Sequence, residues 1–130
     1  MKQNRNRLIQ KVFGLLALLF FLGIIIQVFL AGIALFMDIG KWHYHTTFIH
    51  YVEFIPLVML VISFFGGIPT KFRWQCAGLY LLIVIQYITA NLAGSVPYLA
   101  AFHPIVALLL FLGSLVITRK SLFAINHTKK

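Results

Sequence analysis

Apolar residues dominate the chain in four long runs, and most polar residues fall between these runs. A transmembrane helix needs about 20 predominantly apolar residues, so runs of this length predict helices that cross a bilayer. The predicted membrane helices cover about residues 12–36, 48–65, 77–93 and 98–118. The fold class predicted from this pattern is all-α: a four-transmembrane-helix bundle within a single domain of residues 1–130.

Glycine and proline mark the boundaries of these helices. Gly66 and Gly67 are expected to end the second helix, and Pro97 suits the first turn of the fourth. Proline has no backbone N–H, so Pro56 and Pro104 each leave a carbonyl of the preceding turn without a helical partner. We therefore expect the second and fourth helices to be loosened within about two turns of His50 and His103.

Composition excludes a soluble domain and charge predicts the topology. The chain is 62% hydrophobic with two acidic residues, whereas soluble domains carry about 25% charged residues. Its net charge of +9 comes from clusters beside the apolar runs, a pattern that indicates membrane orientation and argues against nucleic-acid binding. The positive-inside rule predicts a multi-pass plasma-membrane protein with both termini cytoplasmic (N-in/C-in) and basic tails at residues 1–11 and 119–130.

A short repeat links the first and third helices. IIIQVFLAG at residues 24–32 aligns with IVIQYITAN at 83–91, so that Gln27 matches Gln86. Each of these helices is followed by a short outer loop and a helix with a histidine near its outer end. The sequence therefore predicts two pseudo-repeated hairpins about an axis along the membrane normal. The alternative is that apolar helices resemble one another by composition alone.

Ionisable and amide side chains gather in the predicted outer half of the bundle. Ionisable residues within a membrane are costly and mark functional sites by default. The members of this predicted polar site are His50, Glu53, His103, Gln27, Gln86, Asn91 and His45. We expect His43 and His45 to lie in the solvated loop before the second helix, and His50 and His103 to lie at similar depth inside the bundle.

The leading hypothesis is a b-type haem held between His50 and His103. Axial ligation needs one imidazole nitrogen on each side of the iron, and four-helix bundles supply such ligands from facing helices. Glu53, Gln27 and Gln86 would fix the imidazole tautomers or contact the haem propionates. Six-coordinate haem leaves no open position for a substrate, so the expected role is electron transfer or sensing, with a quinone or another redox partner.

Two other functions suit the same residues. Proline-broken helices around a polar cluster are typical of transporters, and Glu53 with the histidines would then form a proton relay in a small homo-oligomeric subunit. An assembly factor without a ligand of its own is the second alternative. A divalent metal site built from His45, His50 and Glu53 is less favoured, because the histidines are five apart and two ligands on one helix face need a spacing of four.

Several residues occur in an order typical of a known family: Asp38, Trp42, His45, His50, QYITAN at 86–91 and VPYLAAFHPIVALLLF at 96–111. This order resembles a bacterial family of small four-helix membrane proteins of unknown function, across most of the chain outside the tails. In that family an asparagine follows the His-Pro pair, and Val106 stands in its place here. The resemblance implies the four-helix topology and directs attention to His45, His50 and His103 without implying a reaction.

A more distant likeness connects the chain to one half of the haem A synthase family. That half is also a four-helix bundle with histidines on its second and fourth helices near the outer face. Its glutamate precedes the histidine, whereas Glu53 follows His50 here. The likeness is architectural, and it implies haem binding without haem modification.

Overall fold

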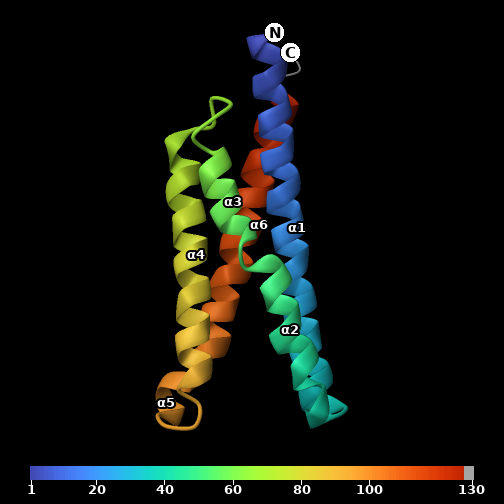
Figure 1. The fold of residues 1–130 in the computed structure, drawn as a ribbon, viewed down its shortest axis with the longest axis vertical. Helices are drawn as coiled ribbons and strands as arrows, with labels where there is room; N and C mark the ends of the chain where they lie inside the picture. The colour runs from blue at the N-terminus through green and yellow to red at the C-terminus, as the bar shows by residue number, and fades with distance from the viewer. Residues whose placement is uncertain (128–130) are drawn as a thin grey trace.

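The computed structural model describes residues 1–127, and the regular structure of these residues is entirely helical. The helices in chain order are α1 (Lys2–Phe36), the short 3-10 helix η1 (Ile39–Lys41), α2 (Trp42–Val52), α3 (Ile55–Ile62), α4 (Thr70–Asn91), α5 (Pro97–Ala100) and α6 (His103–His127). The pairs α2 with α3 and α5 with α6 are interrupted helices, so the chain forms a bundle of four rods (Figure 1). This confirms the predicted all-α, four-helix fold.

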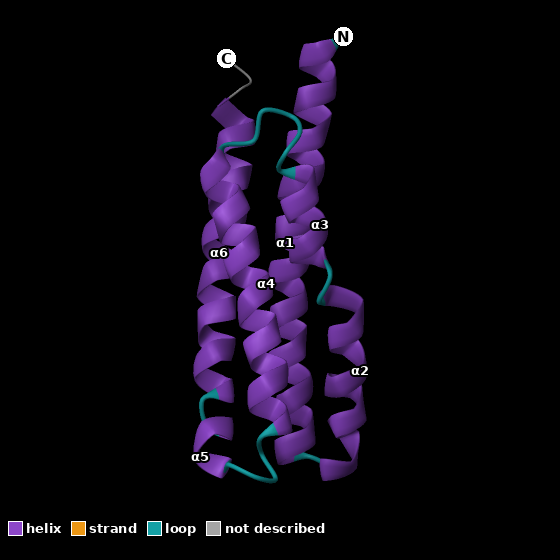
Figure 2. Cartoon of the chain, turned by 60° about the vertical axis from the view of Figure 1, so that its left-hand side comes forward, coloured by secondary structure: helices purple, strands orange, loops and turns teal. Residues whose placement is uncertain are grey.

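The N-terminus and the end of α6 lie at one end of the bundle, together with the turn that joins α3 to α4 (Figures 1 and 2). We call this the basic end, because its elements carry most of the positive charge: Lys2, Arg5, Arg7, Lys11, Lys71, Arg73, Arg119 and Lys120. The other end, with η1, α2 and α5, is called the histidine end. Within the described residues the predicted basic tails are helical, and Lys129 and Lys130 lie outside that range.

The four rods are arranged so that the second and fourth are diagonal to each other. The first rod, α1, packs against α6 on one side and against α2 and α3 on the other, while α4 packs against α3 and α6. Each helix after a predicted outer loop thus packs against the helix that precedes it in the chain. The histidine-bearing helices α2 and α6 therefore belong to diagonal rods, and α2 packs mainly on α1.

The hydrophobic core extends from the basic end to about the middle of the bundle. Its members are Phe13, Ala17, Phe20, Ile24, Met59, Ile68, Phe72, Cys76, Leu79, Ile83, Leu110 and Ile117. Neither α2 nor α5 contributes a residue to this cluster. Small residues permit close helix contacts, as expected where helices associate in lipid: a Cβ at Gly113 would lie 2.9 Å from Leu79 Cδ2.

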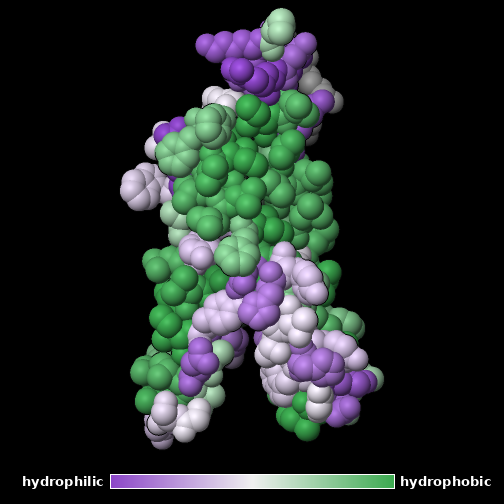
Figure 3. Space-filling model, in the orientation of Figure 1, coloured by the Kyte–Doolittle hydropathy of each residue, from purple (hydrophilic) through white to green (hydrophobic). Residues whose placement is uncertain are grey.

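Three segments of the described chain are long and apolar enough to cross a membrane: Lys2–Phe36, Ile39–Ile62 and Pro97–Phe123. The third rod, α4, carries the amide side chains of Gln75, Gln86 and Asn91 among its apolar residues. Large apolar side chains remain exposed around the bundle, and Figure 3 shows them as a broad hydrophobic surface on the face in view. Such a surface is compatible with lipid, which solvates apolar side chains without cost.

The predicted chain breakers act where the sequence places them. Gly66 and Gly67 follow α3 with φ of 67° and 69°, a conformation that favours glycine because other residues meet a Cβ clash there. Pro56 lies in the first turn of α3, after a break at Glu53 and Phe54. Its missing N–H leaves the Val52 carbonyl without an i+4 partner, which explains why the second rod is divided at this point.

The second rod begins earlier than the predicted start near residue 48. A side-chain bond from the Gly40 N–H to Asp38 Oδ1 (2.9 Å) forms the turn into η1, and α2 begins at once at Trp42. No glycine or proline interrupts residues 41–55, so the polar residues at 43–47 continue the helix. The prediction that His43 and His45 lie in a loop is therefore wrong, because both belong to α2.

Candidate functional site

A cleft divides the histidine end of the molecule. On the face shown in Figure 3 the bundle separates into two legs with a notch between them, and polar surface lines the upper part of the notch. One leg contains η1 and α2 against α1, and the other contains α4, α5 and the start of α6 (Figure 1). Because α2 packs on α1 and makes few contacts with α4 or α6, the core does not extend into this end.

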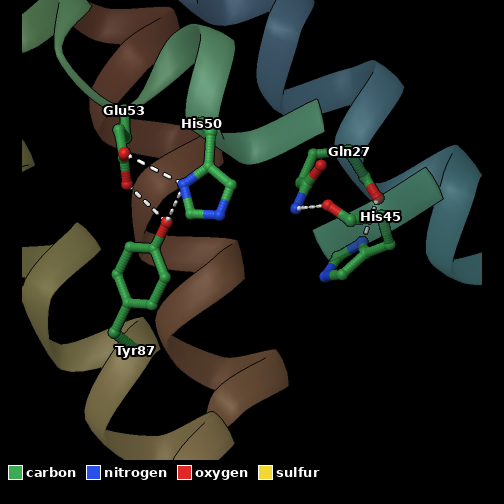
Figure 4. Close-up of polar contacts among 5 residues, drawn as sticks. All are labelled: Gln27, His45, His50, Glu53 and Tyr87. Carbon is green, nitrogen blue, oxygen red and sulfur yellow. Dashed lines mark hydrogen bonds and ion pairs between the residues drawn. The ribbon is translucent and has the colours of Figure 1, made fainter. Parts of the chain in front are cut away.

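His45 is held on α1 by a reciprocal pair of hydrogen bonds with Gln27 (Figure 4). The ring Nδ1 of His45 lies 2.9 Å from the Gln27 backbone oxygen, and Gln27 Nε2 donates to the His45 backbone oxygen at 2.9 Å. A carbonyl oxygen can only accept, so Nδ1 must carry the proton in this bond. In the neutral ring, Nε2 then carries the lone pair. The Trp42 ring packs nearly perpendicular to the same imidazole, with ring centroids 5.4 Å apart.

His103 has the equivalent arrangement on α4. Its Nδ1 lies 3.2 Å from the Gln86 backbone oxygen and 3.1 Å from Thr89 Oγ1. With the Gln86 amide oriented to satisfy its neighbours, Nε2 donates to the His103 backbone oxygen at 2.9 Å and Oε1 accepts from the Ala107 N–H at 3.3 Å. In the same orientation Gln86 Nε2 also lies 3.1 Å from His103 Nδ1. Nδ1 therefore either donates to the Gln86 backbone oxygen or accepts from the amide, and in the first case Nε2 carries the lone pair of the neutral ring.

We call each of these reciprocal arrangements a Gln–His clasp. The histidine follows its glutamine by 18 residues in the first clasp and by 17 in the second. The two glutamines are the pair matched in the sequence repeat, so the two hairpins resemble each other in side-chain contacts as well as in sequence. His45 and His103 also lie within electrostatic range of each other.

Gln27 Oε1 is buried and has no hydrogen-bond partner among the described residues. Its counterpart in the second clasp is satisfied by the Ala107 N–H, so the two clasps differ at this atom. A buried amide oxygen without a donor is costly, and ordered water is the usual partner for such a group. The first clasp therefore has one acceptor left for a water molecule or for a donor on a bound group.

His50, Glu53 and Tyr87 form a separate polar cluster at the break between α2 and α3 (Figure 4). His50 Nδ1 lies 3.1 Å from Glu53 Oε1 and 3.2 Å from the Tyr87 hydroxyl, which also donates to Glu53 Oε2. The Glu53 side chain is 14% exposed and that of His50 is 63% exposed. Glu53 thus has two partners, as expected of an ionisable group in a segment that could cross a membrane.

The structure does not bring His50 and His103 into contact within the described residues. His50 packs against Tyr87 and His103 against Gln86, and consecutive residues on a helix point about 100° apart. Asn91 lies one turn further along α4, where its Nδ2 donates to the Tyr87 backbone oxygen at 3.0 Å. No group of three or more His, Cys, Asp or Glu residues suited to a metal ion occurs in the described part of the chain.

Tyr87 is the site residue that the sequence analysis missed. It follows Gln86 inside an apolar segment, and a hydroxyl group in such a segment is the sequence feature that could have indicated a site residue. The contact itself depends on how α4 packs against the α2–α3 break, which the local sequence does not encode.

Comparison with known proteins matches this chain to a family model. No curated protein and no solved structure gives a significant match. The model of DUF6220, a family of unknown function, matches residues 27–93, just over half of the chain. The matched segment begins at Gln27 and contains His45, His50, Glu53 and Gln86, so it includes the first clasp and the polar cluster at the break in the second rod. The chain therefore belongs to DUF6220, an uncharacterised family, as its resemblance to small membrane proteins of unknown function had predicted.

Proposed function

We propose that this is an integral membrane protein that binds b-type haem in the cleft between its hairpins and uses it for electron transfer or sensing. The observation that carries the proposal is that both hairpins have imidazoles at the histidine end, each with a neighbouring group at its Nδ1. One axial ligand would be His103 of α6. The other would come from α2, which carries both His45 and His50.

The donor set fits haem better than it fits a divalent metal. Haem iron needs only two axial protein ligands, whereas structural metal sites need about four. The histidine helices α2 and α6 are diagonal in the bundle, the placement from which bundles ligate cofactors in their centre. A flat cofactor would also fill the space that the core leaves open at this end. Bound haem with both axial positions filled supplies one-electron chemistry without substrate binding, so its partner would be a quinone or another electron carrier.

The orientation that follows places the basic end in the cytoplasm, with both termini inside and the cleft near the outer surface. Lysine and arginine accumulate on cytoplasmic segments, and the positive residues concentrate on the elements that meet at the basic end. Lys41 is the exception, in η1 at the histidine end. A haem in this cleft would therefore exchange electrons at the outer side of the plasma membrane.

The test is the absorption spectrum of the full-length protein, purified in detergent from a host supplied with haem precursor. We expect a Soret band, with α and β bands that sharpen on reduction by dithionite. The spectrum should be lost in His103→Ala and kept in His43→Ala, a matched control whose ring is exposed and forms a hydrogen bond with the Gly40 oxygen at 2.9 Å. Wild-type protein that stays colourless and binds no added hemin would refute the proposal.

A second candidate, a small transporter subunit with a proton relay, is supported by the His50–Glu53–Tyr87 cluster. The cluster lies at a helix break inside the candidate membrane span Ile39–Ile62, and transporters place the ionisable groups that bind coupling ions at such breaks. A subunit with four rods encloses little volume, so this function would require a homo-oligomer. Proton-coupled flux into reconstituted vesicles that Glu53→Gln abolishes would support it, and flux unchanged in that variant would exclude the relay. An assembly factor without a ligand would show neither haem nor flux.

A further inference from the structure

We infer that His45, and not His50, is the axial partner of His103. Each of the two rings would bond the iron through Nε2 while its Nδ1–H stays in the Gln–His clasp. The inference rests on the proposed function, because it names the ligand set of the same haem site. It departs from the sequence-based hypothesis, which paired His50 with His103.

The first argument is the equivalence of the two clasps. His45 and His103 make the same pair of contacts to Gln27 and Gln86, one through the ring and one through the backbone oxygen. Glutamines on the diagonal rods α1 and α4 hold histidines on the diagonal rods α2 and α6. A haem has two equivalent faces, so two equivalent imidazoles on opposite sides of the bundle suit it.

His50 has no such counterpart. It lies five residues after His45, and the residue five positions after His103 is Leu108, which is 63% exposed on the outside of α6. His50 therefore occupies a position that faces lipid in the other hairpin. Its Nδ1 is shared between Glu53 and Tyr87, and these two residues account for its place in the structure.

The second argument is that each clasp places a carbonyl oxygen beside Nδ1 of its histidine. Histidine ligands almost always donate their other ring N–H to a carbonyl or a carboxylate, which fixes the ring and raises the basicity of the ligating nitrogen. The carbonyl oxygens of Gln27 and Gln86 lie 2.9 and 3.2 Å from Nδ1 of His45 and His103, so each can accept this bond. Both rings are also partly shielded from solvent, whereas His50 is exposed. The clasp fixes this tautomer for His45, and the bond to the Gln86 carbonyl would leave Nε2 of His103 free to ligate in the same way.

The decisive experiment compares ligand replacements in full-length protein titrated with hemin in detergent. We expect wild type and His50→Ala to give the low-spin absorption and EPR signals of bis-histidine haem. His45→Ala and His103→Ala should give high-spin haem or at least tenfold weaker binding. In His45→Gly, added imidazole should restore the low-spin signal, which separates loss of a ligand from loss of the fold.

A second readout uses the protein before hemin is added. In a sample labelled with ¹⁵N-histidine, His45 and His103 should appear as neutral rings protonated at Nδ1, and hemin should broaden or shift both Nε2 signals. High-spin haem in His50→Ala together with low-spin haem in His45→Ala would overturn the inference and leave the proposed function standing. Wild-type protein that binds no hemin would overturn both.

Discussion

Removal of the Tyr87 hydroxyl tests whether the cluster at the α2–α3 break stabilises the bundle. Tyr87→Phe deletes the donor to Glu53 Oε2 and the contact with His50 Nδ1 at 3.2 Å, while the aromatic ring stays in place. Glu53 is 14% exposed and would be left with His50 as its remaining partner. The change in unfolding free energy therefore measures the contribution of one hydrogen bond to a largely buried carboxylate.

The expected cost is about 1.5 kcal/mol of unfolding free energy. Hydrogen bonds between membrane helices average about 0.6 kcal/mol with a maximum near 1.7, and bonds to charged groups contribute about 1.5–3 kcal/mol in soluble proteins. The acceptor here is a carboxylate, which places the bond near the upper end of the membrane range. Glu53→Gln should weaken the same contact, and a double-mutant cycle of the two changes should give a coupling of about 1 kcal/mol.

The single cysteine offers a direct assay for this prediction. Cys76 is fully buried in the core, so a thiol-reactive fluorophore reports its exposure as the bundle unfolds in SDS titrations. The matched control is Tyr98→Phe, whose side chain is 89% exposed on α5 and which should change stability by less than about 0.5 kcal/mol. Equal stability of the Tyr87→Phe and Tyr98→Phe proteins would refute the role given to the cluster.

Three further predictions concern packing and orientation. Gly23→Ala should destabilise the contact of α1 with α2 by about 1–3 kcal/mol, because its Cβ would lie 2.8 Å from Val52 Cγ1. The control is Gly32→Ala, whose Cβ would have no atom within 4 Å. Equal SDS unfolding midpoints of the two variants would contradict the prediction. Thr118→Val should cost about 0.6–1.7 kcal/mol, since the hydroxyl bonds to the Ala17 backbone oxygen at 2.9 Å, and an unchanged midpoint would show that this bond contributes nothing. Reporters of cytoplasmic location should be active when fused to the C-terminus and inactive in the loop between α4 and α5, and the opposite pattern would reverse the proposed orientation.

The sequence predicted those parts of the fold that depend on local chemistry. The four apolar runs correspond to the four rods. Gly66 and Gly67 form a turn with positive φ, and Pro56 lies at the break in the second rod. Each of these features follows from the residues at that place, through helix length, the absence of a Cβ or the absence of an N–H. The start of α2 at Trp42 was missed, because polar residues at the beginning of a helix resemble a loop when composition alone is considered.

The site was harder to predict because its contacts join residues that are distant in the chain. His45 was placed in a solvated loop, and its role became visible only through its bonds to Gln27, 18 residues away. The sequence nevertheless contained a usable signal in the repeat that aligns Gln27 with Gln86. Counted from these glutamines, the histidine that corresponds to His103 is His45, since the separations are 18 and 17 residues, whereas His50 is displaced by more than a helical turn. An internal repeat in a membrane bundle therefore indicates which polar residues of the two halves have the same surroundings, and under the proposed function it selects the pair of histidines that would bind the haem.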